Sequence, residues 1–191
     1  MPRDAAEPTD EALLAAYGRG DGAAARLLTG RLGPRVWRLA RRMLDDPSEA
    51  EDVAQEAMLR LWRIAPDWRE GGAKVSTWLY RVTVNLCTDR LRKGRGVALD
   101  AIPEPEDGQP GQERHLTDAD RAAALEAALG ALPDRQRQAI VLRHLEGLSN
   151  PEIAEIMDLN VEAVESLTAR GKRALAAQLL GRKDELGYED E

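Results

Sequence analysis

The sequence predicts an all-α protein made of two small helical domains joined by an acidic, flexible linker. Ala, Leu, Arg and Glu are abundant and Phe is absent, a mixture that favours helix over sheet. Apolar residues recur at helical spacing on both sides of residues 97–118, which carry three prolines, two glycines and many acids and too few apolar side chains to order themselves. We therefore expect one domain at 1–96, the linker at 97–118 and a second domain at 119–191.

Charge is distributed unevenly along the chain. The formal net charge is −7, which by itself would argue against a nucleic-acid binder. Lys and Arg nevertheless outnumber Asp and Glu by six in residues 26–96, whereas acids outnumber bases by six in residues 97–126. The first domain can thus face a polyanion, while the linker is expected to extend and could itself imitate one; a plain spacer explains the linker equally well.

Several classes of protein are disfavoured by composition. A single cysteine, Cys87, excludes an intramolecular disulfide, and the two histidines give no zinc-ligand spacing. The N-terminus has no apolar run and no later stretch reaches membrane-spanning length. We expect a cytoplasmic protein without cofactor, metal or membrane insertion, with Cys87 on the packed side of its helix.

The first helices follow from glycine and proline punctuation. Residues 10–17 form a short amphipathic pattern, which glycines at 18, 20 and 22 interrupt before a helix resumes at 23–31. Pro34 is expected to open a further helix through Leu44, with one apolar face and one rich in arginine.

The segment 49–64 has the cleanest helical period in the chain. Ser48 and Glu51 predict a capping box at its start. Its apolar positions are Ala50, Val53, Ala54, Ala57, Met58 and Leu61. The opposite face holds Glu51, Asp52, Gln55, Glu56, Leu59 and Arg63. An ordinary solvated surface and a docking face for a basic partner both fit, although a solvated face has no need of the leucine.

The stretch from Trp68 to Arg95 combines a glycine-containing basic loop with a helix that has two unlike faces. On a helical wheel, Leu79, Val82 and Leu86 can pack, and the polar stripe consists of Arg81, Asn85, Thr88 and Arg92. Lys74 precedes the helix, and aromatic rings stand at Trp68, Trp78 and Tyr80. Cations for phosphates, amides for base edges and rings for stacking favour a nucleic-acid strand; a solvated helix with a basic C-terminal turn is the alternative.

The second domain predicts a helix-turn-helix. A helix ends at Gly147, Ser149 and Glu152 form a capping box for a short helix, and residues 158–160 turn the chain into a longer helix, 161–180. If that helix enters a major groove, its outward candidates are Glu162, Ser166, Ala169, Arg170, Lys172 and Arg173. Glu162 and Glu165 repel phosphate, so binding by this domain alone should be weak. Similar packing also occurs in proteins that do not bind DNA.

Three blocks in this order resemble a known family: SEAEDVAQEAMLRLWR, WLYRVTVNLCTDRLRKGR and LPDRQRQAIVLRHLEGLSNPEIAEIMDLNVEAVESLTARGKRAL. They are similar to region 2 and region 4 of bacterial sigma-70 initiation factors of the extracytoplasmic-function group (group IV), and the resemblance spans roughly residues 23–180. It implies a subunit that binds core RNA polymerase, at the β′ clamp and the β flap, and directs it to promoter DNA. The linker resembles one that passes close to the polymerase active centre.

The resemblance also implies roles for residues at matching positions. The helix at 49–62 would dock on the clamp coiled coil through Asp52, Gln55, Glu56 and Leu59. The non-template strand at the −10 element, with one base flipped into a pocket, would be held by Lys74, Ser76, Trp78, Arg81, Asn85 and Arg92. The helix-turn-helix matches the −35 reader, but Ala163 and Glu165 depart from the commoner pattern, so no −35 sequence can be transferred. The form VEAVESLTARGKRAL resembles a subgroup inhibited by zinc-containing anti-sigma proteins, which makes an anti-sigma factor an expected partner.

Two alternatives come from other classes of protein. A stand-alone helix-turn-helix regulator would bind duplex DNA as a dimer, yet no dimerisation helix is evident and the second domain is acidic. An enzyme would need a site, and the carboxylates Glu51, Asp52 and Glu56 lack histidine support. The glycines at 94 and 96 follow a helix and not a strand, so they form no nucleotide-binding fingerprint. We expect no catalysis.

Overall fold

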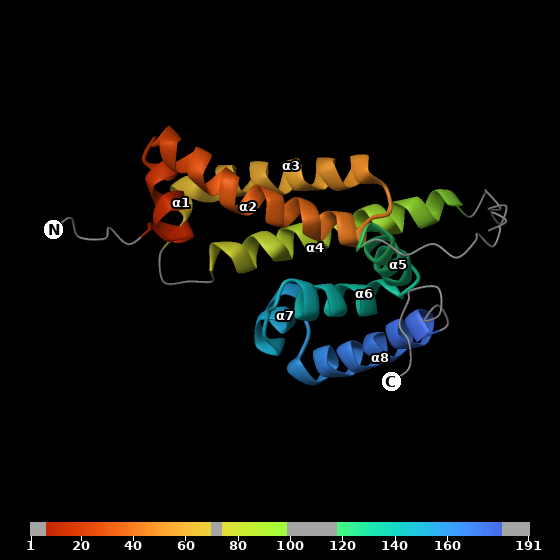
Figure 1. Ribbon diagram of the computed structural model, residues 1–191. Coiled ribbons are helices and arrows are strands. Elements are labelled where there is room, and N and C mark those ends of the chain that lie inside the picture. The colour runs from red at the N-terminus through yellow and green to blue at the C-terminus, as the bar shows by residue number, and fades with distance from the viewer. Residues whose placement is uncertain (1–6, 70–73, 99–117, 181–191) are drawn as a thin grey trace. The chain divides into compact units, whose positions relative to one another are not determined.

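The computed structural model describes residues 7–69, 74–98 and 118–180, and every regular element in these ranges is helical (Figure 1). The all-α prediction is confirmed. The chain divides into two compact units, one dominated by residues 1–87 and one by the remainder. Most of the predicted linker lies outside the described residues, and a helical backbone continues to Ala98, so the predicted domain boundaries stay a prediction. No helix in the described ranges is long and apolar enough to cross a membrane.

The first unit begins with helices α1 (Asp10–Gly18) and α2 (Gly22–Met43). Thr9 caps α1 by accepting a hydrogen bond from the Ala12 N–H at 3.2 Å, and Asp21 caps α2 through the Ala23 N–H at 2.8 Å. Between them the chain turns through Gly20, whose φ of +99° favours glycine.

The prediction that Pro34 opens a separate helix is wrong, because α2 runs through it without a break. A proline inside a helix costs about 3 kcal/mol, since the carbonyl four residues earlier loses its donor. That carbonyl belongs to Gly30, which is exposed to water. Leu32 and Val36 on either side of the proline are 1% and 0% exposed, and burial of such side chains contributes about 1.5–3 kcal/mol each. Packing therefore holds the two halves in one helix.

Helix α3 (Pro47–Ile64) is followed by a short 3-10 helix, η1 (Ala65–Asp67). The predicted capping box of Ser48 and Glu51 is wrong: Asp46 is the cap, and its carboxylate accepts from the Ser48 and Glu49 N–H groups at 2.7 and 3.4 Å. Pro47 then occupies the first helical position, where its fixed φ suits the helix. All six predicted apolar positions, from Ala50 to Leu61, are buried.

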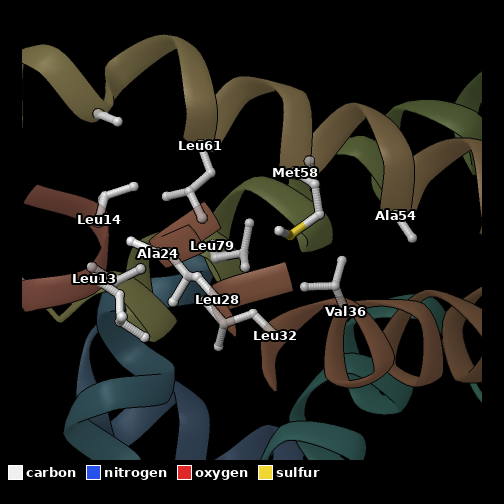
Figure 2. Packing of buried hydrophobic residues seen from close by; sticks show 13 residues of the cluster. Leu13, Leu14, Ala24, Leu28, Leu32, Val36, Ala54, Met58, Leu61 and Leu79 are labelled. Carbon is white, nitrogen blue, oxygen red and sulfur yellow. The ribbon is translucent and has the colours of Figure 1, made fainter. Parts of the chain in front are cut away.

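The core of the first unit is a cluster of aliphatic side chains from four helices (Figure 2). The fourth helix is α4 (Val75–Ala98). Leu14 of α1, Leu28 of α2 and Leu61 of α3 meet Leu79 of α4, and each of these four leucines is fully buried. Cys87 is also buried, as expected. This core fixes which side of each helix faces solvent.

The second unit contains α5 (Asp118–Gly130), α6 (Asp134–Ile140), a π-helical turn η2 (Val141–Leu145), α7 (Asn150–Met157) and α8 (Val161–Leu180). The predicted helix after residue 133 thus changes to π geometry and ends at Leu145, after which the chain turns through Gly147, where φ is +71°. The Glu152 half of the predicted capping box of α7 is present: Glu152 accepts from the Ser149 N–H at 3.0 Å, and it also accepts from the Ser149 hydroxyl at 2.7 Å.

The turn between α7 and α8 is built as a helix-turn-helix requires. Asp158 has a φ of 54°, which closes α7, and the Leu159 N–H reaches back to the Ala154 carbonyl at 2.9 Å. Asn160 caps α8 by accepting from the Ala163 N–H at 2.8 Å. Helix α8 packs closely on α6, because a Cβ built on Gly171 would lie 2.7 Å from Ile140 Cγ1. The predicted helix-turn-helix is confirmed.

Candidate nucleic-acid and protein interfaces

The polar stripe predicted for α4 lies on one side of the helix. Arg81, Asn85 and Arg92 are exposed, and Thr88 is half-buried. Helical spacing of four, three and four residues keeps these side chains in line. Arg92 Nη2 lies 2.7 Å from Asp89 Oδ1, a pairing between exposed groups that a phosphate could replace at little cost. The stripe therefore offers two guanidinium groups and one amide along a single face.

The candidate residues at the start of α4 differ in how far they are exposed to solvent. Lys74 is exposed, and Ser76 and Trp78 are half-buried. The Trp78 ring meets Trp68 edge to face, with centroids 6.4 Å apart, and both pack against the aliphatic cluster. Tyr80 is only 5% exposed, so its predicted role as a stacking ring is wrong. Part of each indole remains accessible to a base, whereas the tyrosine belongs to the core.

The outer face of α3 carries the four predicted docking residues, Asp52, Gln55, Glu56 and Leu59. Leu59 is 49% exposed among polar neighbours. Glu56 Oε1 lies 2.8 Å from Arg60 Nε and 3.8 Å from Arg63 Nη1. The hydrogen bond from Arg60, helped by both positive charges, lowers the pKa of the Glu56 carboxyl below its ordinary value of 4.5. Arginines thus partly neutralise the predicted acidic patch around Glu56.

The outward face of α8 is also as predicted. Its six candidate residues, Glu162, Ser166, Ala169, Arg170, Lys172 and Arg173, are all exposed. Val164 and Gly171 are buried behind them. Asn150 Nδ2 lies 3.4 Å from Glu165 Oε1, which ties the start of α7 to α8. Three cations thus follow a first turn that is acidic, an order that weakens attraction to a phosphate backbone.

Sequence reasoning missed one contact at the start of α4. The Val75 N–H donates to Glu11 Oε1 on α1 at 3.0 Å, across 64 positions of sequence. No local pattern reveals such a pair, because each residue is ordinary in its own segment. Among the residues that the structure describes, no three His, Cys, Asp or Glu side chains gather around a common point.

Two family models of known proteins match this chain, one toward each end of the sequence. The family model for sigma-70 region 2 matches residues 28–97, and that for sigma-70 region 4 matches residues 122–175. The ECF RNA polymerase sigma factor SigW of Bacillus subtilis is 36% identical over 156 residues, which cover 76% of this chain and 83% of SigW. The chain belongs to the extracytoplasmic-function (ECF) group of the sigma-70 family. It is therefore an alternative sigma factor, a DNA-binding regulatory subunit that acts with RNA polymerase in transcription initiation.

Other relatives of this ECF sigma factor agree in class. SigM of Mycobacterium tuberculosis is 37% identical over 175 residues, 92% of this chain and 86% of SigM. SigE of Mycolicibacterium smegmatis is 34% identical, and the match spans 60% of its length. Among solved structures, CnrH in complex with the cytosolic domain of CnrY gives a TM-score of 0.68 at 26% identity, over 91% of this chain and 99% of CnrH. These matches favour the sigma factor over the stand-alone regulator.

Proposed function

We propose that this ECF sigma factor docks on core RNA polymerase through the outer face of α3, holds the −10 non-template strand on the exposed side of α4, and reads the −35 duplex with α8. It would act in the cytoplasm, where polymerase and promoter meet, and would catalyse no reaction itself. The observation that carries the proposal is the separation of three exposed faces with different chemistry on three helices.

The docking face is supported by Leu59. A half-exposed leucine surrounded by charged groups leaves apolar area in water that a protein partner can cover. Asp52 and Gln55 flank it with groups that accept hydrogen bonds. A basic helical partner such as the β′ clamp coiled coil would bury the leucine and face the acids, the arrangement of an apolar centre within a polar rim.

The strand-binding face is supported by the stripe on α4. Arg81 and Arg92 can each meet a phosphate, and the Asn85 amide between them can donate to and accept from a base edge. Flipping a base costs a few kcal/mol, which contacts from the pocket must offset. The half-buried indole of Trp78 adds a surface on which a base can stack.

The −35 reader is supported by the helix-turn-helix geometry. Ser166 and Arg170 are exposed and one helical turn apart, so both can reach the same groove. Lys172 and Arg173 follow, where they can contact phosphates. The β flap is the second polymerase surface we propose for this unit.

A protein inhibitor is the further partner that we propose. The related CnrH was solved together with the cytosolic domain of CnrY. An anti-sigma factor of this kind would cover the faces of α3 and α4, and its release would free them for polymerase. Any zinc would belong to the inhibitor and not to this chain.

Reconstituted transcription tests the proposal. Purified chain and core polymerase should give promoter-dependent transcripts, and Asp52→Lys, alone or with Glu56→Lys, should weaken core binding. Asp67→Lys, which reverses an exposed acid on η1 in the same unit as α3, is the matched control and should bind core normally. The proposal fails if no promoter-dependent transcript forms and the Asp52→Lys/Glu56→Lys variant binds core as well as wild type.

A further inference from the structure

The N-terminus of α4 is capped by a residue from another helix. The first N–H groups of a helix have no partner within it, and Ser, Thr, Asp or Asn just before the helix ordinarily supplies an acceptor. That position holds Lys74, whose ammonium can only donate hydrogen bonds. The Glu11 carboxylate of α1 accepts from the Val75 N–H instead, at 3.0 Å. A carboxylate there also suits the positive end of the helix dipole.

The other end of α1 packs on η1. A Cβ added at Gly18 would lie 2.6 Å from the Ala65 carbonyl oxygen and 3.3 Å from Pro66 Cα, so only glycine allows this approach. The Trp68 N–H donates to the same Ala65 carbonyl at 3.3 Å. Helix α1 thus contacts the chain on both sides of residues 70–73, at η1 before them and at Val75 after them.

Helix α1 is itself fixed to α2. Arg31 Nη1 donates to the Pro8 carbonyl at 2.6 Å and lies 3.4 Å from Asp10 Oδ1. Leu13 and Leu14 are buried in the aliphatic cluster (Figure 2). The helix precedes the part of the chain that the region 2 family model matches, residues 28–97. A cap held this firmly can define where α4 begins.

We propose that Glu11 is a positioning residue for capture of the −10 strand. Because Glu11 caps α4 from outside, a cation can occupy the position of the ordinary cap, and Lys74 and Ser76 are held where the strand would pass. This inference rests on the proposed function of α4 and adds α1 to it. Loss of the carboxylate would let the first turn of α4 fray, which weakens strand binding without touching the −35 reader.

The experiment compares holoenzymes assembled from core polymerase and Glu11→Ala, Glu11→Gln or Glu7→Ala chains. Glu7→Ala is the matched control, because it removes an equal charge from an exposed carboxylate that pairs with Arg31 and not with α4. The probe is a fluorescein-labelled non-template strand spanning the −10 element of a promoter that the wild-type holoenzyme transcribes. A −35 duplex and core polymerase are the second and third ligands.

Glu11→Ala should bind the strand about fivefold more weakly, the loss expected for one helix cap. Glu11→Gln should recover most of the affinity, because its amide oxygen still accepts from Val75. Glu7→Ala should match wild type, and all three should keep wild-type affinity for core and for the −35 duplex.

Two results would overturn the inference alone: equal strand affinity for Glu11→Ala and Glu7→Ala, or an equal loss for all three ligands, which would mean a general loss of folding. Failure of the wild-type holoenzyme to bind the strand would instead overturn the proposed function of α4, and the inference with it.

Discussion

Truncation of Leu59 to alanine is the sharpest test of the docking face. Leu59 is 49% exposed, so a partner can bury about half of what a leucine contributes. Full burial stabilises by about 1.5–3 kcal/mol, which makes the available half worth about 1 kcal/mol. We expect Leu59→Ala to raise the Kd for core polymerase roughly fivefold, measured by fluorescence anisotropy of the labelled chain.

Leu27→Ala is the matched control, because Leu27 is 54% exposed and also lies on a helix, α2. Both variants lose the same methyl groups from half-exposed positions, so their thermal unfolding should change by similar small amounts. Leu27→Ala should leave the Kd for core unchanged. Equal Kd values for the two variants would refute the assignment to α3, and a loss confined to Leu27→Ala would move the docking face to α2.

Four further predictions follow from the described contacts. Gly171→Ala should destabilise the second unit by up to about 2 kcal/mol, because overpacking costs about 1–3 kcal/mol and the higher helix propensity of alanine returns about 1 kcal/mol. Gly30→Ala, with open space around its Cβ, should not destabilise the protein, and thermal unfolding of both variants checks the difference. Asn85→Ala should weaken binding of the −10 single strand by about tenfold and leave core affinity intact, as a strand-binding titration would show. Arg173→Ala should reduce the salt slope of −35 duplex binding by about one, measured as log Kd against log salt. Glu56→Gln should lower the unfolding temperature slightly at neutral pH. The difference should vanish as the pH falls, because stability from a carboxylate of depressed pKa is fully present above the unfolded value near 4.5 and is lost as the pH falls through the lower folded pKa.

Helical period predicted the packed faces well because it depends only on backbone geometry. Every apolar position assigned between Ala50 and Leu61 is buried. Local rules for helix ends did less well where two signals competed. The prediction of a cap at Ser48 left Pro47 out of account. Pro47 prefers the first helical position, which makes the preceding residue, Asp46, the cap. Pro34 ordinarily breaks a helix, but burial of the apolar side chains on both sides of it keeps α2 continuous. Rules that consider only the local sequence do not include this burial.

Some features of the candidate sites could likewise be predicted from helical period, whereas others depend on tertiary packing. The exposed stripes of α4 and α8 follow from the helical period alone. The same period could have predicted that Tyr80 is buried, because Tyr80, Val84 and Cys87 recur at i, i+4 and i+7 and are all buried. The aromatic ring of Tyr80 in a basic stretch suggested stacking on a base, but its position on the helical wheel correctly indicates burial. The contact of Glu11 with Val75 could not be predicted, because it depends on where tertiary packing brings α1.

The charge distribution explains why such a chain would read promoters only as part of a holoenzyme. Three cations on α8 would give a salt slope of only about −2.7 on duplex DNA, and Glu162 opposes them from the first turn. The stripe on α4 is proposed to bind a single strand, which free duplex DNA does not expose. Neither face alone would then hold a promoter tightly. Once core polymerase fixed both faces on one assembly, the second contact would become intramolecular and gain an effective concentration in the millimolar range. Two weak DNA-binding faces would also give the free chain little affinity for non-specific DNA. The proposed binding to core through α3 would then be the step that an inhibitor has to control.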